Sequence, residues 1–259
     1  MKFMKLGMGV CSVAMVLSTM TPVSAESKAT VYVVDRFKGD TYNYRSQTMT
    51  YNKSGLLTKV AQKSTGNLKS AQYYSYKNNR LSKVVYQSNA SKETNTPLYK
   101  KGKLDQLTEN FKDSNSTSRT IHQFYYSKGN IVKVKNTYLD ISGNQVTYYH
   151  YKYKKGLLVE DEVTVYKNDA KGYVSYKEPF YLPGDYTDAA YFTNKYNSKG
   201  LLTAVYVKKL ETYKQKMPKK AVLTVTYKKI KVAKSVVKKV KAQQKWILRG
   251  TGDYSIYNI

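Results

Sequence analysis

A short element recurs six times along this chain and constrains its fold more than any other feature. Each copy ends a strand-like run with a tyrosine, passes through a polar turn that contains Gly (Asn in one copy), and resumes at a fixed Leu or Ile. Gly and Asn tolerate the left-handed backbone that tight hairpins require. We expect each copy to form a type I turn with a left-handed exit. The copies begin at Tyr51, Tyr76, Tyr99, Tyr126, Tyr153 and Tyr196.

A second series of polar, loop-forming segments lies between these turns, at residues 64–67, 88–91, 113–116, 140–143 and 168–172. Together the two series place a turn about every 11 to 14 residues, which favours an all-β meander. We therefore expect a long antiparallel β-meander of repeated hairpins, with about 13 or 14 strands of about 6 to 9 residues. The pattern leaves open whether this sheet is open, coiled or barrel-like.

The expected strands are rich in tyrosine, with 28 Tyr against 6 Phe and 1 Trp. Neighbouring side chains of a strand point to opposite faces, so adjacent tyrosines such as Tyr125 and Tyr126 serve different faces. Cross-strand packing is one role for these rings, and an exposed ladder that stacks on sugars or bases is the other. The candidate ligand-binding residues for the second role are Tyr74, Tyr76, Tyr125, Tyr126, Tyr149, Tyr151, Lys133, Lys135, Lys154 and Lys155.

Residues 1–25 have the pattern of a secretory signal peptide, with Lys2 and Lys5, an apolar stretch and a small-residue site ending at Ala25. We expect cleavage there, and no transmembrane segment after it. Cys11 lies inside this leader and is the chain's one cysteine, so the exported chain has no disulfide. This predicts a secreted or surface-associated, extracellular protein. A lysine-rich, cysteine-free exported chain favours a Gram-positive cell.

The formal net charge is +28, and the excess of basic residues is spread along the whole chain. Such a charge keeps chains apart in solution, and it also attracts polyanions. Because mutual repulsion of so many cations costs stability, we favour an anionic cell-wall polymer or glycan as the partner, without specific nucleic-acid recognition.

The segment 228–259 follows the expected meander of residues 26–227 and is strongly basic. Apolar positions recur in it at helical spacing, which predicts an amphipathic helix, although a strand over 228–240 is an alternative. Such a helix would either pack on the sheet or lie on a membrane with Trp246 in the interface. The residues for membrane or polyanion contact are Lys238, Lys239, Lys241, Lys245 and Trp246.

No arrangement of residues typical of catalysis is present. The two histidines, His122 and His150, have no carboxylate beside them in sequence, and we expect both at the solvent edge of the sheet. Glu160 and Glu162 would share a strand face, where they either pair with lysines across strands or bind a cation. Phosphate-binding loops and zinc-ligand spacings are missing. We expect a protein that is not an enzyme, with no cofactor and no metal.

The recurring element resembles the unit of the YD-repeat, or Rhs-type, family, which reads Tyr-x-Tyr, Asp, two residues, Gly, a variable residue, then Leu or Ile. The resemblance covers about residues 42 to 208. The resemblance implies a long β-meander in a secreted or surface protein, in a family often associated with carbohydrate binding and large toxin shells. This chain is too short for such a shell and has no recognisable toxin domain. Four of the six turns are one residue shorter, and the family's Asp is replaced by Asn52, Lys77, Lys100, Ser127, Lys154 and Asn197.

Three functions follow from these features. The first is a non-enzymatic envelope protein that holds wall polymer through distributed Lys and Tyr. The second is a structural or adhesive surface protein that self-associates through the edges of its sheet. The third is a membrane-active function of residues 228–248.

Overall fold

The computed structural model describes residues 27–40, 45–63, 69–140, 143–155, 157–161, 163–181, 187–212, 219–249 and 254–259. The leader expected at residues 1–25 lies outside the described residues. The described chain forms one antiparallel sheet and one α-helix, which confirms the all-β meander. The strands are β1 (Lys28–Asp40), β2 (Arg45–Tyr51), β3 (Leu57–Lys63), β4 (Lys69–Lys77), β5 (Arg80–Ser88), β6 (Ser91–Lys100), β7 (Lys103–Asp113), β8 (Thr117–Ser127), β9 (Asn130–Asp140), β10 (Gly143–His150), β11 (Lys152–Lys154), β12 (Leu157–Glu160), β13 (Val165–Asn168), β14 (Val174–Tyr181), β15 (Thr187–Tyr196), β16 (Leu202–Leu210) and β17 (Leu223–Ala233).

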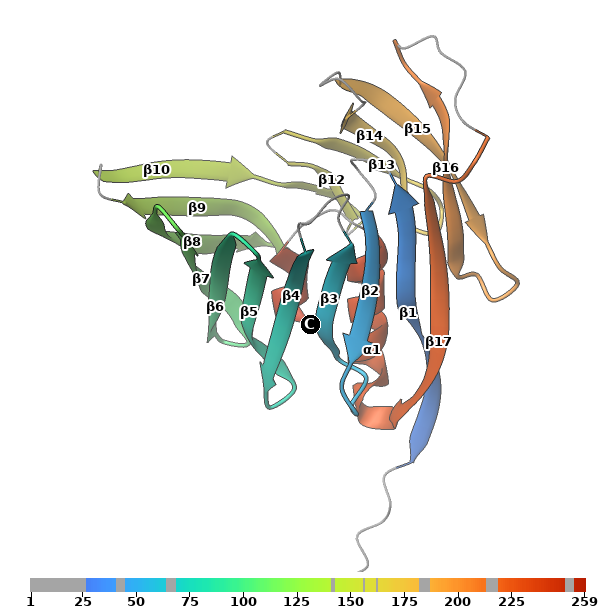
Figure 1. Ribbon diagram of the computed structural model, residues 1–259, viewed down its shortest axis with the longest axis horizontal. Helices are drawn as coiled ribbons and strands as arrows, with labels where there is room; N and C mark the ends of the chain where they lie inside the picture. The colour runs from blue at the N-terminus through green and yellow to red at the C-terminus, as the bar shows by residue number, and fades with distance from the viewer. Residues whose placement is uncertain are drawn as a thin grey trace, which may run out of the picture.

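The sheet curls until it is close to a barrel (Figure 1). Each strand except β10 pairs with the next along the chain, and β17 pairs with both β1 and β16. β10 pairs with β9, and the chain then continues into β11, which pairs with β12 instead. This change of partner divides one bent strand into two. With the short β12 and β13, it explains why the described strands number 17, more than expected.

The repeated turns are of two kinds. Three of the shorter copies are two-residue turns in which both central residues have positive φ, as at Asn78 (51°) and Asn79 (57°) or Lys128 (47°) and Gly129 (85°). That is the type I′ geometry, so the expectation of a type I turn is wrong for them, because I′ matches the right-handed twist of two directly joined strands. The longer copies do form the expected turn, with the N–H of Gly55 donating to the carbonyl of Asn52 at 2.9 Å.

A further turn of the longer kind lies at residues 169–172, within the second series of loop segments. The N–H of Gly172 donates to the carbonyl of Asp169 at 2.9 Å, and Gly172 has a φ of 81°. The sequence pattern was missed because the preceding tyrosine is replaced by Asn168. The repeated hairpin therefore occurs seven times in the described chain, including this turn.

A β-bulge accompanies every one of these hairpins. Tyr51 lies opposite Leu57 while Thr50 lies opposite Lys59, so Thr58 is an extra residue with no partner. Its hydroxyl donates to the carbonyl of Thr50 at 3.1 Å. Bulges increase the local twist, and repeating one beside each turn bends the sheet the same way each time. The extra residues are Thr58, Ser82, Asp105, Val132, Val159, Ser175 and Thr203.

The bulge also changes the spacing of buried residues. Leu57 and Val60 are both buried on the face that packs on the C-terminal helix, although they are three residues apart. We call this the inner face and the opposite one the outer face. The same spacing recurs at Leu81 and Val84, Leu104 and Leu107, Ile131 and Val134, and Leu202 and Val205.

The C-terminal segment closes the inner face. β17 continues to Ala233, past the expected boundary at residue 227, so the strand alternative holds for its first part. A short 3-10 helix, η1 (Lys234–Val236), then leads into α1 (Val237–Arg249), which packs on β1 (Figure 1). The last element, η2 (Tyr254–Asn258), contacts β7. The interpretation in which this helix packs on the sheet is confirmed.

Two buried glutamines connect α1 to the sheet. The Oε1 of Gln243 accepts the N–H of Leu57 at 2.8 Å, and the Oε1 of Gln244 accepts the N–H of Val34 at 2.7 Å. In η2, the Oδ1 of Asn258 accepts the N–H of Leu104 at 2.9 Å. All three donors lie beside bulges, where a backbone N–H needs another partner.

Candidate functional site

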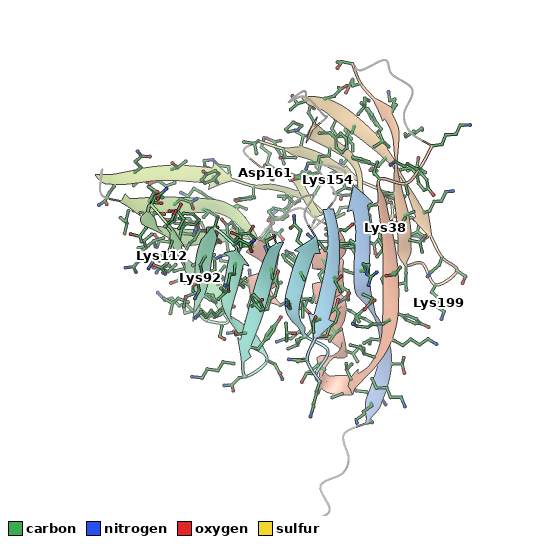
Figure 2. The ribbon with its side chains drawn as sticks, viewed as in Figure 1. Lys38, Lys92, Lys112, Lys154, Asp161 and Lys199 are labelled. Carbon is green, nitrogen blue, oxygen red and sulfur yellow. The ribbon has the colours of Figure 1, made fainter. Side chains whose placement is uncertain are left out.

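The seven repeated hairpins bring their turns to one rim of the curled sheet. Because successive strands are antiparallel, alternate turns of the meander lie on the same edge. We call this edge the turn rim; it carries the β2–β3, β4–β5, β6–β7, β8–β9, β11–β12, β13–β14 and β15–β16 turns. Of these turn residues, Figure 2 labels Lys154 and Lys199.

The turn rim is basic. Among the described residues, its turns contain one carboxylate, that of Asp169, and no cation of the turns forms a salt bridge. Asp169 accepts hydrogen bonds from Tyr196 and Asn194. Burial raises the pKa of Asp169, but these and backbone hydrogen bonds lower it more. The cations are Lys53, Lys77, Arg80, Lys100, Lys101, Lys103, Lys128, Lys154, Lys155, Lys171 and Lys199.

Two of these hairpins place like charges directly opposite each other. Lys77 faces Arg80 across β4 and β5, and Lys100 faces Lys103 across β6 and β7. At the far end of the same pair of strands, Lys92 faces Lys112 (Figure 2). Like charges at directly opposed positions destabilise a sheet. Charge pairing within the fold therefore does not account for these residues.

Tyrosine rings hold several rim cations in place. The guanidinium of Arg80 lies 4.7 Å from the ring centroid of Tyr99, and the ammonium of Lys171 lies 3.9 Å from that of Tyr196. Lys103 lies 5.2 Å from the ring of Tyr126. Such cation–π contacts contribute about 0.5 to 1 kcal/mol at exposed sites. They reduce the freedom of the cations, and one Nη of Arg80 also donates to the carbonyl of Gly102 at 3.2 Å.

Most of the tyrosines predicted to form an exposed ladder lie on the inner face instead. Tyr74 is buried, and four others pack half-buried against the core. The hydroxyl of Tyr76 donates to the carbonyl of Leu57 at 2.8 Å, and that of Tyr126 to Leu104 at 2.7 Å. Of the two roles that the sequence left open, packing and not an exposed ladder holds for these rings, because they lie on the same face as the buried Leu and Val residues. They are Tyr74, Tyr76, Tyr126, Tyr149 and Tyr151.

Tyr125, Lys133 and Lys135 do lie together on the outer face. The ammonium of Lys133 is 4.4 Å from the ring of Tyr125 and 5.5 Å from that of Tyr148. Tyr125 is 37% exposed and Tyr148 is 48% exposed. Our sequence reasoning missed Tyr148, although it lies opposite Lys135 and the alternation from Tyr149 would have placed it outside.

The predicted basic residues fall into two places. Lys154 and Lys155 lie in the β11–β12 turn, on the turn rim. On α1, Lys239 donates to the carbonyl of Asn79 at 2.8 Å and so joins the rim; burial, with a contribution from the nearby Arg80, lowers the pKa of this lysine.

The other α1 residues divide between solvent and core. Lys238, Lys241 and Lys245 are exposed. Trp246 packs half-buried against the core, as expected for the first of the two arrangements that the sequence left open, a helix packed on the sheet. No helix among the described residues is long and apolar enough to cross a membrane.

The histidines behave differently from each other. His122 is buried, with 5% exposure, which corrects the expectation that it lies at a solvent edge. Its Nδ1 is 2.8 Å from the Oδ1 of Asn136 and its Nε2 is 3.4 Å from the Oε2 of Glu109, on the adjacent strand β7. Glu93 lies on the same face. Burial is the largest cause that raises the pKa of this carboxyl, and the nearby carboxylate of Glu109 raises it further. His150 is exposed, as expected.

The acidic cluster near residue 161 is a turn. β12 ends at Glu160, whose carboxylate binds the ammonium of Lys152 at 2.5 Å, as one sequence interpretation predicted. Asp161 accepts the backbone N–H groups of Val163 and Thr164, and Glu162 lies outside the described residues. No group of three His, Cys, Asp or Glu side chains within the described ranges is arranged to hold a metal ion.

Comparison with known proteins identifies no family. No family model matches this chain, and no curated protein matches it. Among solved structures, a porin-like protein from Bacteroides uniformis gives a TM-score of 0.44 at 11% identity, over 78% of this chain and 98% of that chain. A porin-like protein from Bacteroides vulgatus gives 0.39 at 7% identity, over 76% of this chain and 99% of that chain. At TM-scores this low, neither likeness carries an argument.

Proposed function

We propose that this protein is an exported, non-enzymatic protein of the bacterial cell envelope that binds an anionic wall polymer through the turn rim. The observation that supports this most is the opposition of like charges, Lys77 to Arg80 and Lys100 to Lys103, on adjacent strands of the rim. An anionic group placed between two such cations replaces their repulsion by two charge-assisted hydrogen bonds.

The repulsion within each opposed pair of cations is small, so binding would depend on many weak contacts with one polymer. Two unit charges 4 Å apart repel by about 1 kcal/mol in water, so each opposed pair costs little in the free protein. A polymer with repeated anionic groups would relieve several such pairs at once and gain from multivalency. Exposed charges are screened beyond about 8 Å at physiological ionic strength, so binding through them is sensitive to salt.

The test is cosedimentation of the protein with purified cell-wall sacculi, before and after chemical removal of the anionic polymer, across a salt series. The rim variant carries Lys100→Gln, Lys101→Gln and Lys103→Gln. The matched control carries Lys38→Gln, Lys208→Gln and Lys219→Gln, which remove the same charge from exposed lysines away from the rim. We expect the rim variant to lose binding and the control to keep it. Equal losses in the two variants, or binding that survives polymer removal, would overturn the proposal.

A second candidate function, self-association through a sheet edge, is favoured by β10. This strand pairs with β9 from Gly143 to His150, and no other described strand pairs with it. It lies at the outer side of the projecting β8–β9–β10 unit (Figure 1). β10 is exposed over almost its whole length and contains no Lys, Arg or Pro, the residues that commonly protect an edge strand.

Sedimentation velocity over a wide concentration range tests this alternative. Val146→Lys places a charge on the β10 edge, and Val163→Lys places one on an exposed valine outside any strand. Self-association through β10 predicts oligomers that Val146→Lys abolishes and Val163→Lys leaves intact. A monomer at every concentration would rule this function out.

A further inference from the structure

A cavity of about 260 Å³ lies inside the curled sheet, between the last turn of α1 and the inner faces of several strands. It belongs neither to the turn rim nor to the outer face. Its volume is just below the roughly 300 to 1,000 Å³ of typical small-molecule sites. The described residues that line it are Phe37, Gln47, Tyr166, Tyr173, Val174, Lys177, Asn194, Leu202, Val205, Leu223, Ile247, Leu248 and Arg249.

Two cations line this cavity. Lys177 comes from β14 and Arg249 from the end of α1, and no carboxylate is among the described lining residues. Burial lowers the pKa of Lys177, because an ammonium removed from water is disfavoured. The nearest carboxylates are those of Asp161, which acts on Lys177, and Asp169, which is bonded to Asn194. Neither of them lines the cavity, so the full charges that face it are the two cations, beside the partial negative charge of about half a unit at the C-terminal end of α1. The cavity therefore favours an anion.

A buried acceptor at the cavity has no partner. The Nδ2 of Asn194 donates to the Oδ2 of Asp169 at 2.9 Å and to the carbonyl of Val174 at 3.0 Å. These two bonds fix the orientation of the amide, and they leave its Oδ1 buried without a hydrogen bond. Buried polar atoms are almost always hydrogen-bonded, so an orphaned acceptor beside a cavity indicates a donor on the cavity side. A carboxylate has no donor of its own, so with such a ligand the donor would be a water molecule that bridges the Oδ1 of Asn194 and the head group.

The remaining wall is largely apolar. Aliphatic and aromatic side chains from β1, β14, β16, β17 and α1 form it, and several of them are core residues. Small-molecule sites commonly combine such walls with a few polar groups that fix orientation. We propose that this cavity binds a small amphiphile with a carboxylate head, which pairs with Lys177 and Arg249, and an apolar body that contacts Leu202, Leu223 and Ile247.

Titration of the full-length protein with octanoate tests the proposal, by calorimetry and by the fluorescence of Trp246, the one tryptophan, which precedes three lining residues of α1. We expect one saturable site for octanoate and much weaker binding of octanol and octylamine, which match its chain but lack the anion. Removing a hydrogen bond to a charged group costs about 1.5 to 3 kcal/mol, so Lys177→Gln and Arg249→Gln should each weaken binding at least about tenfold. Lys195→Gln, on an exposed lysine of the neighbouring strand β15, should leave it unchanged.

A second variant separates the cavity from general charge. Val174→Phe fills the cavity without changing any charge, and should abolish octanoate binding while a thermal transition shows that the protein is folded. Equal binding of octanol and octanoate, an equal loss in Lys195→Gln, or unchanged binding in Val174→Phe would each overturn the proposal. The variant that carries Lys100→Gln, Lys101→Gln and Lys103→Gln should keep octanoate binding. The cavity proposal and the wall-polymer proposal are therefore tested independently of each other.

Discussion

The hydroxyl of Tyr76 donates a hydrogen bond of 2.8 Å to the carbonyl oxygen of Leu57, which begins the strand beside its own. The relationship recurs around the sheet, where the tyrosine at one hairpin is bonded to the previous strand. The same bond joins Tyr51 to Val34, Tyr99 to Leu81 and Tyr126 to Leu104. Tyr227, which lies within β17 and not at a repeated hairpin, makes the equivalent bond to Leu202 of β16. The recurring tyrosine therefore joins neighbouring hairpins, which backbone pairing alone does less well at a bulge.

Tyr76→Phe should destabilise the fold by about 1 to 3 kcal/mol, because it removes two hydrogen bonds and leaves buried partners unpaired. The lost bonds run from the hydroxyl to Leu57 and from the Nε2 of Gln243 to the hydroxyl at 2.7 Å. Tyr73→Phe is the control, because Tyr73 lies on the outer face with 40% exposure. Chemical denaturation of both variants measures the difference. If the Tyr76→Phe variant were as stable as the Tyr73→Phe variant, the hydrogen bonds of Tyr76 would make no contribution to stability.

Gln243→Leu should be destabilising although leucine is apolar and close in size. The change leaves the N–H of Leu57 without its acceptor at a position where both residues are buried. An orphaned buried donor costs about 1 to 3 kcal/mol. Lys241→Leu, on the exposed side of the same helix, serves as the control for helix propensity. Urea midpoints of the two variants decide the matter, and a Gln243→Leu midpoint at or above that of Lys241→Leu would show that the bond adds nothing.

Gly55→Ala and Gly129→Ala form a matched pair. Both glycines have positive φ, 79° and 85°, so alanine carries the same backbone penalty of about 1 to 2 kcal/mol at each. A Cβ on Gly55 would lie 2.6 Å from the Cγ1 of Val232, whereas a Cβ on Gly129 meets nothing within 4 Å. Overpacking adds about 1 to 3 kcal/mol. The melting temperature of the Gly55→Ala variant should therefore lie well below that of the Gly129→Ala variant. Equal melting temperatures would mean that β17, which contains Val232, shifts to accommodate the added Cβ.

Stability should fall as the pH rises above 10. Burial, as the largest cause, raises the pKa of Tyr76 to about 12 and that of Tyr99 to about 12, from the ordinary value of 10.0. Between pH 10 and pH 12 the unfolded chain loses these protons while the folded chain keeps them, so unfolding becomes more favourable as the pH rises. Melting temperature and tyrosinate absorbance followed over this window should change together. Full ionisation of the tyrosines with the fold retained would contradict the burial of these hydroxyls.

The sequence was sufficient for the meander because Tyr, Gly and Leu recur at fixed spacing, and each marks a strand end, a turn or a strand start. It was not sufficient for the face of each tyrosine. Simple alternation does not reveal the bulge at Thr58 and its equivalents, which brings Leu57 and Val60 to one face. Three-residue spacing of apolar residues directly after a turn is the signal that would have revealed it.

The candidate site was partly predictable for the same reason. Lys154 and Lys155 were assigned correctly to a turn, but a linear sequence does not show that alternate turns gather at one rim. The cavity was not foreseen, because Lys177 and Arg249 come from distant segments that only the curl of the sheet brings together. His122 and Glu109 likewise meet across β7 and β8.

Binding of a phosphodiester polymer should depend on salt through the rim. A single-stranded oligothymidylate serves here as a polymer of known charge spacing, and each cation that pairs with a phosphate contributes about 0.7 to the slope of log K against log salt concentration. Replacing Lys100, Lys101 and Lys103 by Gln should therefore reduce the slope by about 2, whereas the control variant at Lys38, Lys208 and Lys219 should keep it. Fluorescence anisotropy across a salt series measures both slopes. If the control loses as much as the rim variant, attraction depends on net charge alone and the position of the turns has no part in it.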